Sequence, residues 1–319
     1  MAIKFIKNLI PEYNEATIDE TGFDDNLTGT ARLIKPDGSF NIKKKGRLAF
    51  SVYEFLLEMS WMGFFARLIV FFFFINSCFA AVIMMHGVEH IEGASYSSVT
   101  EAFFEALFFS IQTFTTVGYG FMHPNGIIMN LIASLIAFSG LLTFALATGL
   151  FFSRFSRPLA HLIYSEKLII SPNKAGEKSL QFRIVNATNN QLINAEAVVT
   201  LTWLETNGDK RNRKFQRLDL EIEKIFLFPL NWTIIHPINE QSPLYHQDLE
   251  SLDMQHVEFL ILIKAYDETY DKYIHSKKSY WYKDIEANKS FVTMYEMTGN
   301  ETLLHIEKIN DTIDAQCDK

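Results

Sequence analysis

Two long apolar stretches stand out in the first half of the chain. The first runs from Leu68 to Met85 and the second from Gly126 to Phe152, and neither contains a charged residue. A helix rises 1.5 Å per residue, so the second stretch is about 40 Å long as a helix. Lengths of this order cross all or most of the apolar part of a bilayer. The pattern therefore predicts two membrane-spanning helices, and Asn76 and Ser77 in the first are expected to face another helix.

Two shorter helical segments accompany these spans. Within residues 50–65 apolar residues recur at helical spacing, with Glu54 and Glu58 on the other face. This pattern predicts an amphipathic helix in the membrane interface, and a buried helix of a soluble domain is the alternative. Between the spans, residues 100–114 have an apolar helical pattern but are too short to cross a bilayer. They predict a re-entrant pore helix.

The second half of the chain has a different pattern. After Pro158, short runs of β-branched and aromatic residues alternate with turn signals such as Asn207-Gly208. The clearest runs are residues 180–185, 195–204, 225–228, 232–235, 257–265 and 291–297. They predict an antiparallel β-sandwich of six to nine strands between residue 165 and about residue 310.

The segment before the first helix is mainly polar. Residues 1–30 show no sustained periodicity and are expected to be weakly ordered. Pro36-Asp37-Gly38 is a turn signal, and a short strand is expected on either side of it. We therefore divide the chain into an N-terminal segment (1–46), an interfacial helix with a two-span pore domain (47–158) and a sandwich domain (159–319).

The distribution of charge predicts the topology. Residues 68–153 contain no lysine or arginine. The connection between the spans carries Glu89, Glu92, Glu101 and Glu105. Basic residues flank the other ends of the spans: Lys43, Lys44, Lys45, Arg47, Arg67, Arg154 and Arg157. By the positive-inside rule, both termini are cytoplasmic and the connection is outside.

Composition excludes several classes of function. The net charge of −8 argues against a nucleic-acid partner. The two cysteines, Cys78 and Cys317, are not placed for a structural disulfide, so the chain does not require an oxidising compartment. The first thirty residues contain no apolar signal-peptide core, so the first span is expected to direct insertion. Two spans without an arginine-rich helix argue against a voltage sensor.

The segment Thr115–Gly120, which reads Thr-Thr-Val-Gly-Tyr-Gly, follows the predicted pore helix. A dehydrated potassium ion needs oxygen ligands that replace its water shell, and rings of backbone carbonyls supply them. Successive carbonyls can point the same way only if alternate residues adopt backbone angles that glycine accepts. Gly118 and Gly120 provide this freedom, so the segment predicts a potassium selectivity filter.

The other filter residues have distinct expected roles. The Thr116 hydroxyl can add a ligand at the inner end, whereas the Val117 and Tyr119 side chains are expected to point away from the ions. One copy of the chain cannot close a ring of carbonyls, so the motif predicts a homotetramer. The predicted filter consists of Thr116, Val117, Gly118, Tyr119 and Gly120, and its potassium ions are bound by the carbonyls of residues 116–119. No organic cofactor is expected.

Two other functions match parts of the sequence. His86-Gly87-Val88-Glu89-His90 has the H-x-x-E-H pattern of zinc peptidases, in which His86 and His90 would bind zinc from one helix face. Gly87 lies inside this pattern and no third ligand is obvious nearby. A membrane-tethered β-sandwich that senses a ligand without conduction is the second alternative. The filter in its re-entrant context favours a channel, which is not an enzyme, over both.

Further segments point to a known family. They are Asp37–Asn41, Ser60-Trp61, Ser153–Pro158, Trp232–His236, Glu240–Tyr245 and Tyr266–Thr269. With the filter, they resemble the inward-rectifier potassium channels, and the bacterial members most closely, over roughly residues 30–310. The resemblance implies a tetramer with two spans per subunit, an interfacial slide helix and an immunoglobulin-like cytoplasmic domain that extends the pore. It also implies a multi-pass protein of the bacterial inner membrane.

The resemblance assigns candidate gating positions. Phe152 falls at the bundle-crossing constriction, where a large apolar side chain from each subunit can close the pore by dewetting. A lipid-facing aromatic residue is the alternative for Phe152. Gly140 falls at the inner-helix hinge glycine, and Gly149 in the same helix is a further hinge candidate.

Two pore-lining positions bear on rectification. Phe144 falls where strongly rectifying members place an acidic residue for block by polyamines and magnesium. Lys264 falls where such members have a second acidic residue, in the cytoplasmic pore. Neither residue attracts those cations, so weak rectification is expected.

Two departures from the family pattern favour a bacterial origin. Many relatives pair a glutamate of the pore helix with a basic residue after the filter, and Gln112 and Met122 occupy those places here. The extracellular cysteine pair of eukaryotic members is also missing.

Basic residues near the inner leaflet are candidates for binding phosphoinositide or another anionic lipid. They are Lys45, Arg47, Arg154, Arg157 and Lys167. Each basic residue near an anionic membrane contributes about 1 kcal/mol of binding free energy. The alternative is that these residues only orient the helices.

Overall fold

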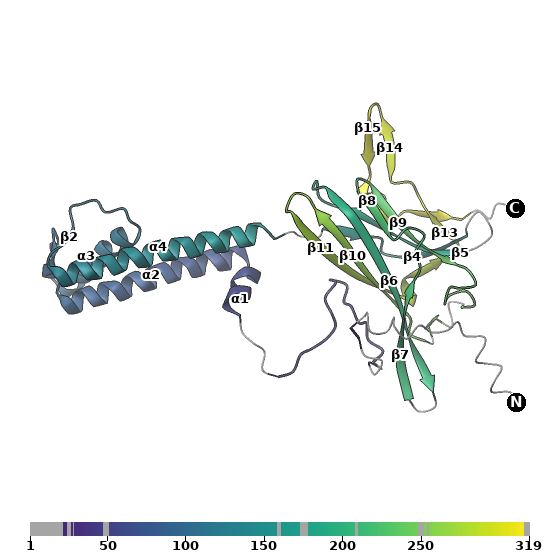
Figure 1. Ribbon diagram of the computed structural model, residues 1–319, viewed down its shortest axis with the longest axis horizontal. Coiled ribbons are helices and arrows are strands. Elements are labelled where there is room, and N and C mark those ends of the chain that lie inside the picture. The colour runs from purple at the N-terminus through teal and green to yellow at the C-terminus, as the bar shows by residue number, and fades with distance from the viewer. Residues whose placement is uncertain are drawn as a thin grey trace. The chain divides into compact units, whose positions relative to one another are not determined.

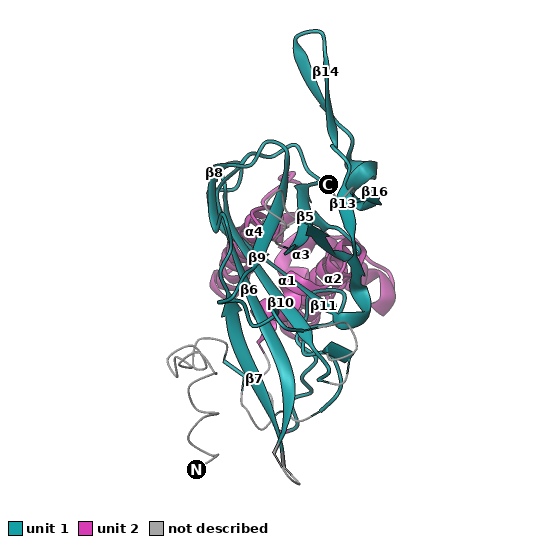
Figure 2. Ribbon diagram, turned by 90° about the vertical axis from the view of Figure 1, so that its right-hand side faces the viewer, with its two compact units in different colours: residues 1–45, 158–319 teal, residues 46–157 magenta. Residues whose placement is uncertain are grey.

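The computed structural model describes residues 22–23, 27, 29–46, 51–157, 161–172, 178–207, 210–247, 252–253 and 255–315. The chain divides into two compact units, which Figure 2 shows in different colours. Residues 46–157 form the pore unit, and residues 1–45 together with 158–319 form the sandwich unit. The described N-terminal residues up to Lys45 therefore belong to the same unit as the sandwich.

The pore unit is mainly helical. Its elements are α1 (Val52–Glu58), α2 (Trp61–His86), η3 (Val88–His90), β1 (Ile91–Glu92), α3 (Val99–Phe114), β2 (His123–Pro124) and α4 (Ile127–Phe155). Both α2 and α4 are long and apolar enough to cross a membrane. The shorter α3 packs against both of these spans (Figure 1).

The interfacial helix expected over residues 50–65 is two elements in the structure. Helix α1 ends at Glu58, and α2 begins at Trp61. The Ser60 hydroxyl accepts a hydrogen bond from the Gly63 N–H at 3.2 Å, and Ser60 is therefore the N-cap of α2. Capping by serine satisfies a donor that would otherwise have no partner in the first turn, so the chain starts a new helix there. The prediction of one continuous helix was wrong.

The described residues of the sandwich unit form two five-stranded sheets. The first contains β6 (Leu192–Asn207), β7 (Lys210–Leu218), β8 (Lys224–Leu227), β10 (Glu258–Asp267) and β11 (Lys272–Trp281). The second contains β3 (Leu162–Tyr164), β4 (Leu168–Pro172), β5 (Lys178–Asn186), β9 (Asn231–Ile238) and β12 (Ile285–Ala287). The strand pairs are antiparallel except β12 with β4. The predicted sandwich is confirmed, although the two sheets contain ten strands among the described residues, more than the six to nine expected.

Smaller elements lie directly before and after β12, the last strand of the two sheets. They are η4 (Tyr282–Asp284), β13 (Lys289–Phe291), β14 (Tyr295–Thr298), β15 (Glu301–Leu304), η5 (Ile306–Asn310) and β16 (Thr312–Asp314). Strands β14 and β15 form a hairpin that stands away from the two sheets (Figure 1). The run predicted over residues 291–297 is interrupted between β13 and β14, where Met294 is fully buried in a cluster with Val185 and Ile309.

The core lies between the two sheets and follows their alternation. In β9, every second residue is buried, from Trp232 through Ile234 and His236 to Ile238. Side chains of a strand point alternately to opposite faces, so this pattern places one face of β9 in the core. Phe182, Val199 and Phe259 of other strands belong to the same hydrophobic cluster.

The described N-terminal residues pack on the first sheet. The buried Glu258 carboxylate accepts hydrogen bonds from the N–H groups of Leu33 and Ile34, the shortest being 2.9 Å. The buried Arg213 guanidinium donates to the carbonyls of Leu27 and Gly29 at 2.9 and 2.6 Å. Burial raises the pKa of Glu258, although its hydrogen bonds and the Arg213 charge oppose that effect.

The strands expected around the Pro36-Asp37-Gly38 turn are reduced to a single bridge between Ile34 and Phe40. A Cβ atom on Gly38 would lie 2.7 Å from the Lys277 carbonyl oxygen, so glycine is needed for this close approach.

Candidate ion-conduction site

Alternate residues of the Thr115–Gly120 segment have left-handed backbone angles. The φ angle is +60° at Thr116, +48° at Gly118 and +87° at Gly120. Left-handed angles at alternate residues are the geometry expected for carbonyls that share one direction. The prediction named the two glycines but not Thr116, for which a left-handed conformation is unfavourable by about 1–2 kcal/mol.

The filter follows directly from the end of α3. The Thr115 N–H donates to the Ile111 carbonyl at 2.9 Å, which closes the last turn of the helix. The N–H groups of Val117 and Gly118 both donate to the Gln112 carbonyl, at 2.9 and 3.2 Å. The inner part of the filter is therefore held by the pore helix itself.

A buried polar contact fixes α3 against α2. Asn76 and Ser110 are both fully buried, and the Ser110 hydroxyl donates to Asn76 Oδ1 at 2.8 Å. The Asn76 amide donates in turn to the Phe72 carbonyl at 2.9 Å. Polar side chains inside a membrane bundle form such bonds between helices because no water is available there. The expectation that Asn76 faces another helix is confirmed.

The end of α3 also lies against α4. A Cβ atom on Gly140 would lie 1.9 Å from the Phe114 carbonyl oxygen, so the two backbones are in direct contact. Phe114 is the last residue of α3 and immediately precedes the Thr115–Gly120 segment. Gly140 therefore sets how closely α4 approaches the base of the filter.

Arg154 near the end of α4 is engaged within the pore unit. Its guanidinium donates to the carbonyls of Leu56, Leu57 and Met59 at 2.5, 3.2 and 2.8 Å. It also lies 4.5 Å from the centre of the Trp61 ring. These are the free carbonyls at the carboxyl end of α1, which a positive charge stabilises.

Comparison with known proteins gives two matching families. Residues 162–318 match the inward rectifier potassium channel C-terminal domain, and residues 69–157 match the ion channel family. The inward rectifier potassium channel Kirbac3.1 of Paramagnetospirillum magnetotacticum is 33% identical over 270 residues, which are 83% of this chain and 89% of that channel. The chain belongs to the inward rectifier potassium channel family.

A eukaryotic relative of the family is more distant. The human G protein-activated inward rectifier potassium channel 2 is 24% identical over 277 residues, 78% of this chain and 64% of that channel. Inward rectifier channels transport potassium and form tetramers, and they are not enzymes. The family assignment thus confirms the predicted class of protein.

The gate, hinge and rectification positions have different surroundings. On α4, Phe144 and Phe152 are exposed in the single chain, at 75% and 73%. Nothing lies within 4 Å of a Cβ atom on Gly149, in contrast to Gly140. On β10, the Lys264 ammonium lies 4.7 Å from the centre of the Tyr273 ring.

The candidate lipid-binding residues are divided between the two units. Lys45 and Lys167 belong to the sandwich unit, whereas Arg154 and Arg157 belong to the pore unit. Lys45 and Arg157 are exposed and Lys167 is half-buried. Arg47 lies outside the described residues. Lipid binding at these residues stays a prediction.

The zinc-peptidase pattern is not formed as one helical face. Helix α2 ends at His86, Gly87 follows with φ +120°, and Glu89 and His90 belong to the separate η3. The His86 and His90 rings stack with their centres 4.6 Å apart. Among the described residues, no group of three or more His, Cys, Asp or Glu side chains is placed to hold a metal ion.

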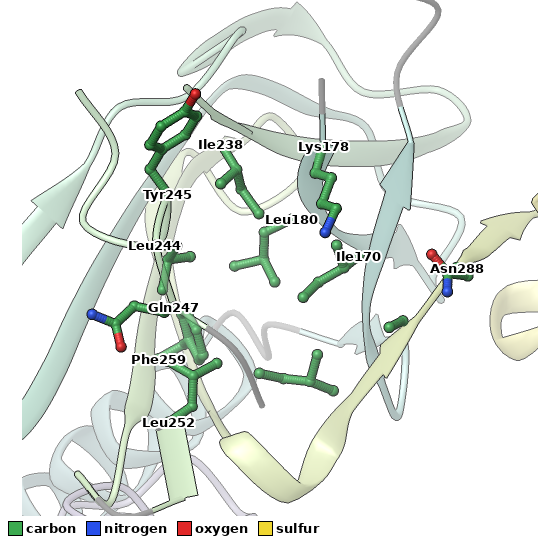
Figure 3. Close-up of a pocket in the computed structure, with 12 residues that line it drawn as sticks. Ile170, Lys178, Leu180, Ile238, Leu244, Tyr245, Gln247, Leu252, Phe259 and Asn288 are labelled. Carbon is green, nitrogen blue, oxygen red and sulfur yellow. The ribbon is translucent and has the colours of Figure 1, made fainter. Parts of the chain in front are cut away.

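The sandwich contains a cavity of about 420 Å³ beside β4, β5 and β9. Its walls are mostly apolar, with Leu180 and Ile170 on one side and Leu244 on the other (Figure 3). Its polar lining residues are Lys178, Tyr245, Gln247 and Asn288. The ligand-sensing alternative assigned no residues, and this cavity is one of several in the described part of the sandwich unit.

Several residues of the site could not be found from sequence reasoning. Ser110 is one of several polar residues in α3, so its signal in the sequence is weak and becomes meaningful only with Asn76 opposite it. Arg154 carried a signal for charge near the membrane but none for its partners on α1.

Proposed function

We propose that four copies of this chain form a potassium-selective pore for passive potassium transport. The observation that carries the proposal is the alternation of left-handed backbone at Thr116, Gly118 and Gly120. Potassium selectivity requires rings of carbonyl oxygens, and this backbone is suited to supplying them. Membership of the inward rectifier family supports the same function.

The single chain supports assembly as a homotetramer. Val117 and Tyr119 are 54% and 84% exposed in one subunit. Large apolar and aromatic side chains beside a filter need packing partners to hold its diameter, and neighbouring copies would supply them. Potassium would then bind to the carbonyls of residues 116–119, with the Thr116 hydroxyl at the inner end.

We further propose a plasma-membrane location with both termini cytoplasmic. The basic residues that flank the spans and the acidic connection between them support this orientation. The proposed domains are the N-terminal segment (1–46), the slide helix and pore (47–158) and the cytoplasmic sandwich (159–319).

Weak rectification is part of the proposal. An aromatic residue at Phe144 and a basic residue at Lys264 provide no negative charge to concentrate polyamines or magnesium in the pore. Phe152 is the proposed gate and Gly149, which has open space around it, is the less constrained of the two hinge candidates.

Regulation by anionic lipid rests on Lys45, Arg47, Arg157 and Lys167. Arg154 is the weakest of the candidates, because a lipid phosphate would have to displace three carbonyl oxygens of α1 from its guanidinium. A phosphoinositide headgroup is the expected ligand. Its effect on potassium flux is measured by comparing vesicles that contain phosphoinositide with vesicles that lack it.

A flux assay tests the proposed function. Purified tetramer in liposomes should pass potassium or thallium, exclude sodium and be blocked by barium. Equal sodium and potassium permeability would contradict the proposal. Matched vesicles with and without phosphoinositide separate conduction from its regulation.

A further inference from the structure

The segment after the filter is paired with the connection that precedes α3. Strands β1 and β2 are antiparallel, with Ile91 opposite Pro124 and Glu92 opposite His123. The Asn125 N–H extends the pairing by donating to the His90 carbonyl at 2.8 Å. The segment after the filter is therefore joined by backbone hydrogen bonds to the segment that precedes the pore helix α3 in the chain.

One carboxylate joins two side chains of this segment. Glu92 Oε2 lies 2.9 Å from His123 Nε2, and Glu92 Oε1 accepts a hydrogen bond from Asn125 Nδ2 at 2.7 Å. His123 and Asn125 follow shortly after the last filter residue, Gly120. Glu92 thus contacts two residues of the segment that follows the filter.

A glycine brings the same connection against the filter itself. Gly93 has φ +88°, and a Cβ atom on it would lie 2.2 Å from the Phe121 carbonyl oxygen. Phe121 is the first residue after the filter. The contact requires both the left-handed angle and the missing side chain, so the backbone of the connection rests directly on the filter's outer end.

The usual polar support of the filter is neutral in this chain. The family resemblance puts Gln112 and Met122 where many members have an ion pair, and Gln112 Nε2 lies 3.3 Å from Met122 Sδ. A thioether is a weak acceptor, so this contact holds the filter less strongly than an ion pair would.

We propose that Glu92, His123 and Asn125 form an outer clasp that positions the outer end of the filter in place of that ion pair. The proposal rests on the proposed channel function. Both members of the contact between Glu92 and His123 are about half exposed, at 53% and 55%. Exposed pairs make modest contributions, so losing the clasp should change selectivity by about two- to fivefold rather than abolish it.

The test measures the ratio of potassium to sodium permeability in liposomes. This ratio does not depend on how many channels assemble, so it separates positioning of the filter from loss of folded protein. Glu92→Ala should lower the ratio by about two- to fivefold. Glu89→Ala is the matched control, because this exposed carboxylate of the same connection makes no hydrogen bond or ion pair with other described residues.

A double-mutant cycle sharpens the result. Asn125→Ala should lower the ratio, and the double variant Glu92→Ala/Asn125→Ala should lose less than the sum of the single effects, because both remove the same contact. The exchanged pair Glu92→His/His123→Glu should recover part of the ratio lost in Glu92→Ala. Where Glu92→Ala does not assemble, Asn125→Ala alone decides the outcome.

The outcomes distinguish this inference from the function on which it rests. A wild-type protein without potassium preference overturns the channel proposal. A selective wild type, with an unchanged ratio in assembled Glu92→Ala and Asn125→Ala, overturns only the outer clasp. Equal losses in Glu92→Ala and Glu89→Ala would also overturn it, since general removal of negative charge would then explain both.

Discussion

The sandwich unit and the pore unit use their apolar residues in opposite ways. The sandwich buries its large apolar side chains between two sheets, and Phe259 and Ile184 in this core are fully inaccessible within one chain. The pore unit leaves many of its apolar residues exposed, including Phe74 on α2 and Leu135 on α4. Its buried core is a small cluster around α3.

This difference shows what each unit requires from its surroundings. The sandwich has a core that one chain completes, so its stability depends on internal packing. The internal contacts of the pore unit lie around α3, at the base of the filter. Its exposed apolar faces are available to contact lipid and other subunits. Substitutions in the two units should therefore affect different measurements.

The largest expected effect is at the filter. Gly118→Ala places a side chain at φ +48°, which costs about 1–2 kcal/mol in each subunit and about 4–8 kcal/mol in a ring of four. Potassium flux in liposomes should fall by more than about a hundredfold. The circular dichroism of the sandwich strands should not change. A flux near that of wild type would show that the carbonyl geometry is not fixed by this glycine.

The next effect separates two glycines of one helix. Gly140→Ala forces a Cβ atom against the Phe114 carbonyl, and overpacking of this kind costs about 1–3 kcal/mol. The melting temperature of the tetramer and the potassium flux should both fall. Gly149→Ala meets open space and should raise helix stability by up to about 1 kcal/mol, so any loss of flux in it reports on bending. Equal melting temperatures for the two variants would contradict the packing role of Gly140.

A third variant adds negative charge to the pore unit. Phe144→Asp should make the pore sensitive to spermine, with about tenfold tighter block, since carboxylates attract cations strongly where water is limited. Block is measured as the spermine concentration that halves potassium flux. Phe144→Asn is the uncharged control. If Phe144→Asp shows no gain in block, this position does not line the conduction path.

The proposed gate gives a smaller change of opposite sign. Phe152→Ala should raise the resting potassium flux, by up to about tenfold if the closed state dominates at rest. Phe155→Ala, a second exposed aromatic residue of α4, serves as the control. Unchanged resting flux in Phe152→Ala, or an equal rise in both variants, would remove Phe152 as the gate.

The smallest expected effect is a change in how the stability of the sandwich unit depends on pH. Buried His236 lies 2.6 Å from the Asp219 carbonyl and 2.8 Å from the Ser242 hydroxyl. Burial lowers the pKa of His236, although the Asp219 carbonyl opposes this. The neutral form therefore contributes stability above about pH 6.5, and this stability is lost as the pH falls through the lowered value.

The apparent melting temperature should accordingly fall between pH 7.5 and 5 in wild type, and less steeply in His236→Gln. The exposed His275→Gln is the control and should keep the wild-type slope. A slope that is the same in all three proteins would show that His236 does not link proton binding to folding.

Periodic segments of the fold were predictable from sequence. The apolar stretches became α2 and α4, and the strands with alternating or continuous apolar residues became β5, β6, β8, β9 and β10. The predicted runs did not include β3, β4, β7, β11 or β12. Strands β3, β4 and β12 are short, whereas β7 and β11 are polar and lie at the ends of the first sheet. A strand at the end of a sheet can be polar, because pairing with its one neighbour keeps it in the sheet and charged residues are common at sheet edges.

The site was predictable where chemistry depends on residue type alone. Glycine at alternate filter positions has a conformational meaning that does not require a partner. The contacts of Ser110, Gly140 and Arg154 each join residues far apart in the chain, so no local pattern reveals them. The break at Ser60 was missed because a capping serine inside an apolar periodic segment resembles an ordinary helical residue.

The acidic connection between the spans has an electrical consequence. In the proposed tetramer, every subunit contributes Glu89, Glu92, Glu101 and Glu105 on the proposed outer side, and the connection between the spans contains no lysine or arginine. Such a field raises the local concentration of cations and weakens as the Debye length shortens, from about 30 Å in 0.01 M salt to about 10 Å in 0.1 M salt. The pore would then receive potassium from a reservoir richer than the bulk solution, and conduction at low ionic strength would saturate at lower bulk potassium.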